Sequence, residues 1–455
     1  MSEESAQTAQ ASESSMRRVA VTALAGTSIE WFDFFLYGTA AALVFPTVFF
    51  SEDMPYFVSL IASFSTFAIG FLARPVGGVV FGHFGDRIGR KKALVTALML
   101  MGLATTLIGL LPTYASIGFF SPLLLMILRF AQGLAVGGQW GGAMLLVTEN
   151  APAGKRGYYG AFAQAGAAVG LILANAAFLA VTAAFTPEGF MEWGWRIPFI
   201  ASIVLIGLSL YVQLRLEDTP AFKELQARTA SRPPAALATE DAAEIAVARP
   251  SPVLEALVRY PRQIALAAGA FLAVQVTFYI LVSFVIAYGT NPDGLNIPRS
   301  TLLLAVLISS AVQLPALFLA SIYSDTHGRR GVYMLGAVLL GGWAFAIFPL
   351  IDTGSFLMIC LSVCVGQVFI GMMYGPQAAF LAELFSTNVR YSGASLGYQL
   401  GAIFGGAFAP IIATALLASS GSTFGISIYI AIACGITLLS VYLLSETHRS
   451  ELTAT

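Results

Sequence analysis

The chain has 455 residues, of which 57% are hydrophobic and only 10% are charged, and its mean hydropathy is +0.80. Soluble domains usually carry about 25% charged residues, so the composition excludes an ordinary soluble protein. The formal net charge of −1 gives no reason to expect nucleic acid or another polyanion as a partner. The three cysteines lie in apolar segments, where we expect them to pack as small hydrophobic residues. A protein that crosses a membrane many times fits these observations.

Apolar segments of membrane-spanning length recur along the whole chain. A helix of about 20 residues crosses about 30 Å of hydrocarbon. The segments lack the alternation of polar and apolar residues that is typical of membrane strands. We therefore predict an all-α membrane protein with twelve transmembrane helices. The expected spans are residues 19–50, 56–81, 93–112, 119–148, 158–185, 197–214, 263–289, 301–323, 332–350, 355–382, 392–418 and 424–444.

Charge placement predicts the orientation of these spans. Of the 23 Lys and Arg residues, all but Arg74, Arg129, Arg196 and Arg299 fall in the tails or in connections on one side of the predicted bundle. Positive residues concentrate on the cytoplasmic side of membrane proteins. We therefore expect both termini and the central connection in the cytoplasm, and the protein in the cell (plasma or inner) membrane.

A polar, proline-containing connection divides the spans six and six, and the halves resemble each other. Asp86 and Arg90 follow the second span, as Asp325 and Arg329 follow the eighth. Two acid–base pairs recur seven residues apart, Glu149 with Arg156 and Glu383 with Arg390. Parallel six-helix repeats with a site between them are typical of transporters. The predicted organisation is a disordered tail over 1–18, bundles over 19–215 and 263–446, a cytoplasmic linker over 216–262 and a tail over 447–455.

Several motifs resemble those of one transporter family. The segment GHFGDRIGRKKAL after the second span resembles the signature loop of the major facilitator superfamily. Within that superfamily the chain resembles the metabolite:H+ symporters, which include permeases for α-ketoglutarate, citrate, shikimate and zwitterionic osmolytes. This resemblance implies the major facilitator fold of two pseudo-symmetric six-helix bundles. Gln139 stands where that family usually has Glu. The motifs are GTSIEWFDFFLYG, FLARPVGGVVFGHFGD, LRFAQGLAVGGQWGGAMLLVTENAP and AELFSTNVRYSGASLGYQLG.

Four ionisable residues fall inside the predicted spans of the first half. Glu30 and Asp33 lie about 16 and 21 Å from the cytoplasmic end of the first helix, and Arg74 and Arg129 lie at similar depth. Charges within a membrane are costly and usually functional. We interpret the group as a coupling or substrate site; the alternative is a structural cluster of ion pairs.

Proton coupling requires a group that changes charge between the two sides of the membrane. His83, His327 and His448 all fall outside the spans, which leaves Glu30 and Asp33. Burial raises the pKa of a carboxyl and a nearby arginine lowers it, so either acid can be tuned to titrate. The sequence leaves open which of the two carries the proton, and whether the coupling ion is H+ or Na+.

The spans of the second half carry neutral polar residues instead of charges. Such residues can orient a substrate by hydrogen bonds or join helices to one another. Tyr37, one turn after Asp33, is expected to face the same site. The predicted substrate-binding residues are Arg74, Arg129, Tyr37, Gln275, Tyr279, Tyr374 and Gln377, and the further polar residues of these spans are Gln313, Tyr398 and Gln399.

Charged residues at the cytoplasmic helix ends predict a gate. Ion pairs among them can close the cytoplasmic side and must break for opening, a role that the superfamily resemblance also implies. The alternative is that they only fix orientation. The predicted gate residues are Asp86, Arg90, Glu149, Arg156, Asp325, Arg329, Glu383 and Arg390.

The sequence therefore predicts a secondary active transporter that takes up a small organic anion, such as a mono- or dicarboxylate, with protons by alternating access. The alternatives are proton-coupled efflux and symport of a zwitterionic osmolyte. No cluster of catalytic residues lies at usable depth, so we expect no enzyme activity, no cofactor and no metal. The expected partners are the substrate, H+ and the lipid bilayer, with no nucleic acid, and the protein is expected to be a monomer.

Overall fold

The structure is a computed structural model that describes residues 3–88, 90–137, 144, 147, 148, 151, 152, 154–215, 257–385 and 390–448. Side chains are described for these residues except 3–15, 18, 82–94, 205, 206, 208–215 and 391. Most of the predicted linker over 216–262 lies outside the described residues, as do Gln139 and Glu149.

Helices make up both halves, because a helix pairs its own backbone N–H and C=O groups where no water is available. In the first half, the described elements are α1 (Glu3–Leu43), α2 (Phe45–Val48), α3 (Tyr56–Ile88), α4 (Arg90–Leu110), α5 (Tyr114–Ile117), α6 (Phe120–Gly137), α8 (Arg156–Ala184), α9 (Pro187–Gly189), η1 (Phe190–Gly194) and α10 (Arg196–Arg215). The elements written η are π-helical turns.

The second half repeats this pattern, with π-helical turns inside two of its spans. The elements are α14 (Pro261–Tyr279), η3 (Ile280–Phe284), α15 (Val285–Thr290), α16 (Arg299–His327), α17 (Arg329–Asp352), α18 (Phe356–Leu384), α19 (Arg390–Gly401), η4 (Ala402–Ala407), α20 (Ala409–Ser420) and α21 (Phe424–Leu443).

The all-α prediction is confirmed, and each predicted span overlaps at least one helix of the described part of the chain. In the described part of the chain, ten helices are long and apolar enough to cross a membrane, and Val95–Leu110 is a shorter apolar helix. From Glu3 onward, the structure has the backbone of the predicted tail as the start of α1, where the sequence predicted disorder. Ala, Glu and Gln have high helix propensity, and extending an existing helix avoids the cost of nucleation.

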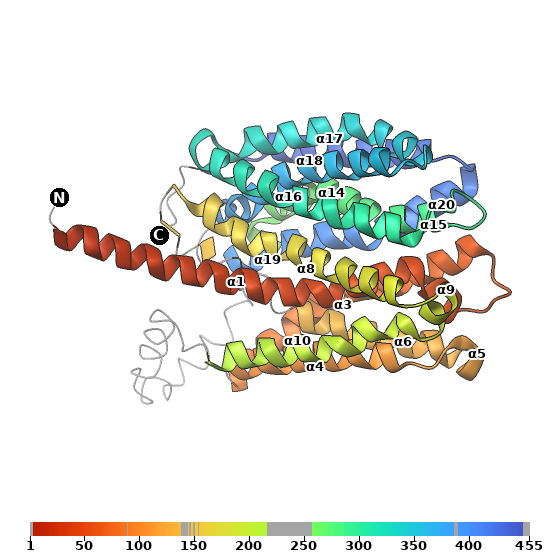
Figure 1. Ribbon diagram of the computed structural model, residues 1–455. Helices are drawn as coiled ribbons and strands as arrows, with labels where there is room; N and C mark the ends of the chain where they lie inside the picture. Colours follow the sequence, from red (N-terminus) through yellow and green to blue (C-terminus); the bar gives the residue numbers. More distant parts are fainter. Residues whose placement is uncertain are drawn as a thin grey trace.

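The two halves lie side by side, and both chain termini lie at the same end of the bundle (Figure 1). We call this the terminal end, and the end that carries α5, α9 and the α15–α16 connection the distal end. Contacts between the halves run through α8 with α16 and α18, and through α3 with η4 and α20. The site described next lies between these helices.

Candidate functional site

Both predicted arginines are buried in a layer of aromatic side chains. The guanidinium carbons of Arg74 and Arg129 lie 4.4 and 4.3 Å from the ring centroid of Phe34, which therefore contacts both. Cation–π contacts offset part of the cost of burying a positive charge. We call these residues the arginine layer: Trp31, Phe34, Tyr37, Phe67, Phe71, Arg74 and Arg129.

Glycines on α3 and α6 make room for this layer. A Cβ atom on Gly70 would lie 2.5 Å from Nε of Arg129, and one on Gly137 would overlap the backbone carbonyl oxygen of Arg74. Gly77 and Gly133 likewise face backbone atoms of the opposite helix. Small residues allow this close approach between membrane helices, so these glycines fix where the two arginines lie.

The arginines keep unsatisfied donors. Nη1 of Arg129 donates to Gln132 at 3.1 Å, but Nε and Nη2 of both Arg74 and Arg129 are buried without a hydrogen-bond partner. Among the described residues, no carboxylate lies within ion-pair distance of either guanidinium group, although Arg74 interacts with Glu30 at longer range. Buried polar groups normally find partners, and a set of exceptions is a reason to look for a ligand.

Asp33 is buried and accepts no hydrogen bond. Its side chain lies near Thr105 and Ser202. The two hydroxyls donate elsewhere, to the backbone carbonyls of Met101 and Phe199 at 2.8 Å each. An ionised carboxylate is expensive to bury unless it is paired, so this environment suits a carboxyl that carries a proton.

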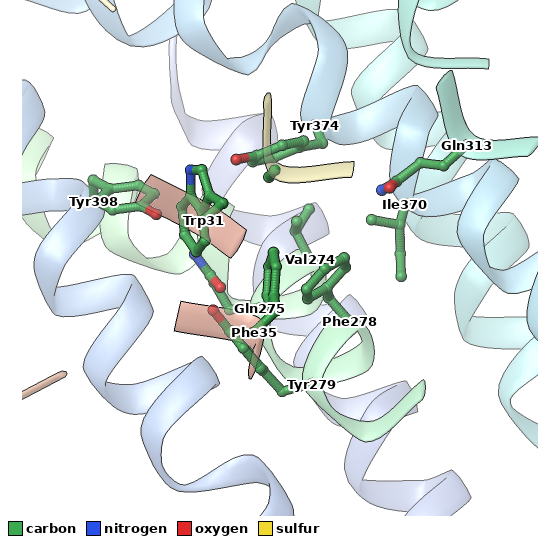
Figure 2. Close-up of a pocket in the computed structure, with 11 residues that line it drawn as sticks. Trp31, Phe35, Val274, Gln275, Phe278, Tyr279, Gln313, Ile370, Tyr374 and Tyr398 are labelled. Atoms are coloured by element: carbon green, nitrogen blue, oxygen red, sulfur yellow. The ribbon is translucent and has the colours of Figure 1, made fainter. Parts of the chain in front are cut away.

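A central cavity lies between the halves (Figure 2). It shares Trp31 with the arginine layer. The hydroxyls of Tyr374 and Tyr398 and the amide of Gln275 point toward Trp31 on one side of it, while Gln313 lies with Ile370 on the other. The space holds little more than one water molecule. The halves must therefore move apart before an organic ligand can enter. The lining residues are Trp31, Phe35, Ala167, Val274, Gln275, Phe278, Tyr279, Gln313, Ile370, Tyr374 and Tyr398.

Three of the predicted substrate-binding residues, Gln275, Tyr279 and Tyr374, line this cavity. Arg74 and Arg129 lie behind it, where Arg74 approaches Tyr398 and both interact electrostatically with Tyr279.

The other two predicted substrate-binding residues, Tyr37 and Gln377, do not line the cavity. Tyr37 donates its hydroxyl to Thr66 at 2.7 Å, and Nε2 of Gln377 donates to the Tyr333 hydroxyl at 2.7 Å. These contacts join helices within one half.

Aromatic lining residues are what the sequence analysis missed. Trp31 and Phe35 are four residues apart on α1, so they share one helical face, and both line the cavity with Phe278. Their spacing in the WFDFF motif could have indicated one aromatic wall, but not which face looks inward.

At the terminal end, charged residues join the two halves. Asp325 on α16 accepts hydrogen bonds from the backbone N–H groups of Gly157 and Tyr158, at 2.7 and 2.9 Å, at the start of α8. Arg329 pairs with Asp325 at 2.7 Å and with Glu383 at 3.1 Å. A carboxylate at a helix N-terminus is favoured by the helix dipole. We call this network the terminal gate: Arg156, Gly157, Tyr158, Asp325, Arg329 and Glu383, in which Arg156 lies 3.9 Å from Glu383.

Of the remaining predicted gate residues, only Arg390 has a described side chain. Arg390 is buried at the start of α19. The backbones of Asp86 and Arg90 lie at the end of α3 and the start of α4, while their side chains and Glu149 are outside the described part of the chain.

The segment after α21 extends the gate in a way that the sequence analysis missed. Glu446 accepts hydrogen bonds from the N–H groups of Arg329 and Arg330, at 2.8 and 3.0 Å, and so caps α17. Thr447 donates its hydroxyl to Glu383 at 2.7 Å. Burial raises the pKa of Glu446, but four backbone N–H donors outweigh it and hold that pKa below its usual value.

Sequence comparison identifies the family. The profile of the sugar (and other) transporter family matches residues 19–454, which is nearly the whole chain. The chain belongs to this transporter family. It is 41% identical over 444 residues to the inner membrane metabolite transport protein YhjE of Escherichia coli (strain K12), covering 96% of each chain. It is also 38% identical to the shikimate transporter of the same strain, covering 95% of each.

Structural comparison supports the same assignment for this transporter. The major facilitator superfamily proton:xylose symporter XylE matches with a TM-score of 0.71 at 17% identity, covering 96% of this chain and 98% of XylE. The major facilitator fold with its twelve transmembrane helices is thereby confirmed, as is the resemblance to metabolite transporters. These relatives are transporters and not enzymes, so the protein is a membrane transporter of the sugar and metabolite class.

Proposed function

We propose that this transporter takes up a small organic anion, a mono- or dicarboxylate, together with protons. The observation that carries the substrate class is a pair of buried arginines, each with two donor atoms that lack partners, beside a cavity lined by Tyr and Gln side chains. Planar guanidinium groups suit carboxylates. Even from behind the aromatic wall, two positive charges in a low-dielectric surrounding favour an anion in the cavity.

Alternating access follows from the two closures. The terminal gate closes one side of the cavity through contacts between the halves. At the distal end, the Tyr56 hydroxyl donates to the backbone carbonyl of Ala287, at 3.1 Å, and so joins α3 to α15. Opening one closure at a time would expose the cavity to one side of the membrane and then to the other.

We assign the coupling proton to Asp33 rather than Glu30. Asp33 accepts no hydrogen bond and, in the described part of the chain, has only the neutral hydroxyls of Thr105 and Ser202 nearby. Glu30, in contrast, has the charge of Arg74 to balance it. The asymmetry of Lys and Arg supports a cytoplasmic terminal end, and the relation to YhjE supports the inner membrane. We expect the protein to act as a monomer.

The proton assignment is tested in proteoliposomes with Asp33→Asn and, as the matched variant, Glu30→Gln. We expect Asp33→Asn to keep exchange of substrate down its gradient and to lose accumulation driven by a pH jump. Glu30→Gln should still accumulate substrate. Accumulation by Asp33→Asn at the unmodified rate contradicts the assignment.

A second candidate substrate is a zwitterion with a quaternary ammonium group. The aromatic rings of Trp31, Phe35, Phe278 and Tyr279 around the cavity are the kind of lining that binds such cations. A thermal-shift screen of the purified protein against organic acids, betaines and sugars distinguishes the two. Stabilisation by betaines alone would replace the carboxylate proposal.

A further inference from the structure

A second cavity lies at the distal end, between the halves. Its volume of about 390 Å³ is within the usual range of small-molecule sites, about 300–1,000 Å³. Phe185 and Phe190 line it from the first half, and Asn296, Arg299 and Ser300 line it from the second. We call it the distal pocket. Because its walls belong to both halves, its shape depends on how far the halves are apart.

Arg299 gives the distal pocket a positive charge. Its guanidinium carbon lies 4.3 Å from the ring centroid of Phe190, and its Nη1 atom is buried without a hydrogen-bond partner. The lining residues include no acid, so nothing in the wall neutralises this charge. The polar remainder of the wall consists of neutral side chains such as Ser300 and Asn296.

Arg196, the other arginine predicted on this side, also contacts an aromatic ring, that of Trp195, but it differs from Arg299 in its hydrogen bonds. Its Nη1 donates to the backbone carbonyls of Gly109 and Leu111, at 2.9 and 2.7 Å. It therefore secures the end of α4, and it does not line the pocket. The two arginines form a matched pair: one is occupied by structural contacts and the other is available to a ligand.

The start of α16 adds to the preference for an anion. Arg299 is its first residue, and no side chain caps this helix. The first N–H groups of a helix have no partner within the helix, and its dipole favours negative charge there.

We propose that the distal pocket is a second ligand site, which binds a small carboxylate from the outer solution before it reaches the central cavity. The route to the central cavity depends on the proposed function, but binding at the distal pocket does not. The planar fork of Arg299 suits a carboxylate, and the apolar faces of Phe185 and Phe190 suit the carbon skeleton that carries it.

Charge in the pocket is tested by placing a thiol in it. Ser300→Cys is made in a variant in which Cys360, Cys364 and Cys434 are replaced by Ala. The protein is placed in phosphatidylcholine nanodiscs and modified with a negatively charged or a positively charged methanethiosulfonate. One positive unit charge about 6 Å away in water raises the modification rate of the anionic reagent about threefold and lowers that of the cationic reagent about threefold. Adding Arg299→Gln should therefore lower the anionic-to-cationic rate ratio about ninefold, whereas Arg196→Gln should change it less than twofold. Equal effects of the two substitutions would overturn the proposal.

Ligand binding is tested by protection of the same thiol. Sodium succinate or sodium shikimate should slow its modification when Arg299 is present and should have no effect in Arg299→Gln. Protection should persist in Arg74→Gln, which disables the central site. The outcome of this test is therefore independent of whether the proposed function is correct. If neither acid protects the thiol, the proposal is wrong. The proposal is also wrong if nanodiscs that contain phosphatidylglycerol protect the thiol when no acid is added, because the pocket would then hold a lipid headgroup.

Discussion

Asp325→Asn should open the terminal gate without touching the central cavity. The carboxylate accepts two backbone N–H groups from the other half, and its side chain is only 5% exposed. Hydrogen bonds to a charged acceptor contribute about 1.5–3 kcal/mol each, against about 0.5–1.5 kcal/mol for neutral ones. Asn keeps one acceptor and no charge, so the closed state loses about 2 kcal/mol, a shift of about 30-fold toward the open state.

The assay is modification of a cysteine beneath the gate. Ser321 is buried between Gly157 and Gly375, and Ser321→Cys in the background without native cysteines should react slowly with N-ethylmaleimide. When opening is fast, the reaction rate follows the population of the open state, so Asp325→Asn should raise it about 30-fold. Asp293→Asn, which removes the same charge from an exposed distal residue, is the control. A change below threefold with Asp325→Asn would refute the reasoning.

Three further substitutions test the layer, the cavity and the gate. Gly137→Ala should lower stability by about 1–3 kcal/mol through overpacking against α3. Gly26 has open space around it, so Gly26→Ala should be neutral or stabilising by up to about 1 kcal/mol. Thermal unfolding of both variants in detergent measures the difference. Tyr398→Phe should weaken carboxylate binding about tenfold by removing a hydrogen bond from the tyrosine hydroxyl to the charged carboxylate of the ligand. Tyr37→Phe should change the affinity less than twofold, and ligand titration measures both. Glu446→Gln should lower the melting temperature at neutral pH. Because the pKa of Glu446 is lowered in the folded protein, its stabilisation is present above the usual value of 4.5 and is lost as the pH falls through the lowered pKa. The melting temperatures of the two proteins should therefore differ by a constant amount well above pH 4.5 and converge as the pH falls from 4.5 through the lowered pKa. A difference that persists below that pKa would contradict the capping role.

The positions of the helices could be predicted from sequence because apolar length alone decides where a chain crosses the membrane. Depth along a helix also follows from residue counting, which placed Glu30, Asp33, Arg74 and Arg129 in one region. Which face of a helix looks inward could not be predicted. Lipid and helix–helix contacts are equally apolar, so Trp31 and Phe35 carry no periodic signal that separates a cavity wall from a lipid contact.

Hydrogen-bond partners could not be predicted from the sequence either. Gln377 and Gln275 are the same residue type and both lie inside predicted spans, yet one binds Tyr333 and the other lines the cavity. Glu446 lies in a short polar segment without a pattern, and its role exists only because the end of α21 lies beside the start of α17. Asp325 and Glu383 could be singled out from sequence because acids at the matching positions of the first half, Asp86 and Glu149, repeat the pattern.

The separation between the arginine layer and the cavity has an evolutionary consequence. The charges lie on α1, α3 and α6, whereas most polar groups of the lining lie on α14, α16, α18 and α19. On the proposed function, a single substitution on the second set of helices can change which molecule fits the cavity and leave the proposed coupling residues unchanged. Relatives that share this arrangement could then evolve different substrate specificities and keep the same proposed coupling mechanism.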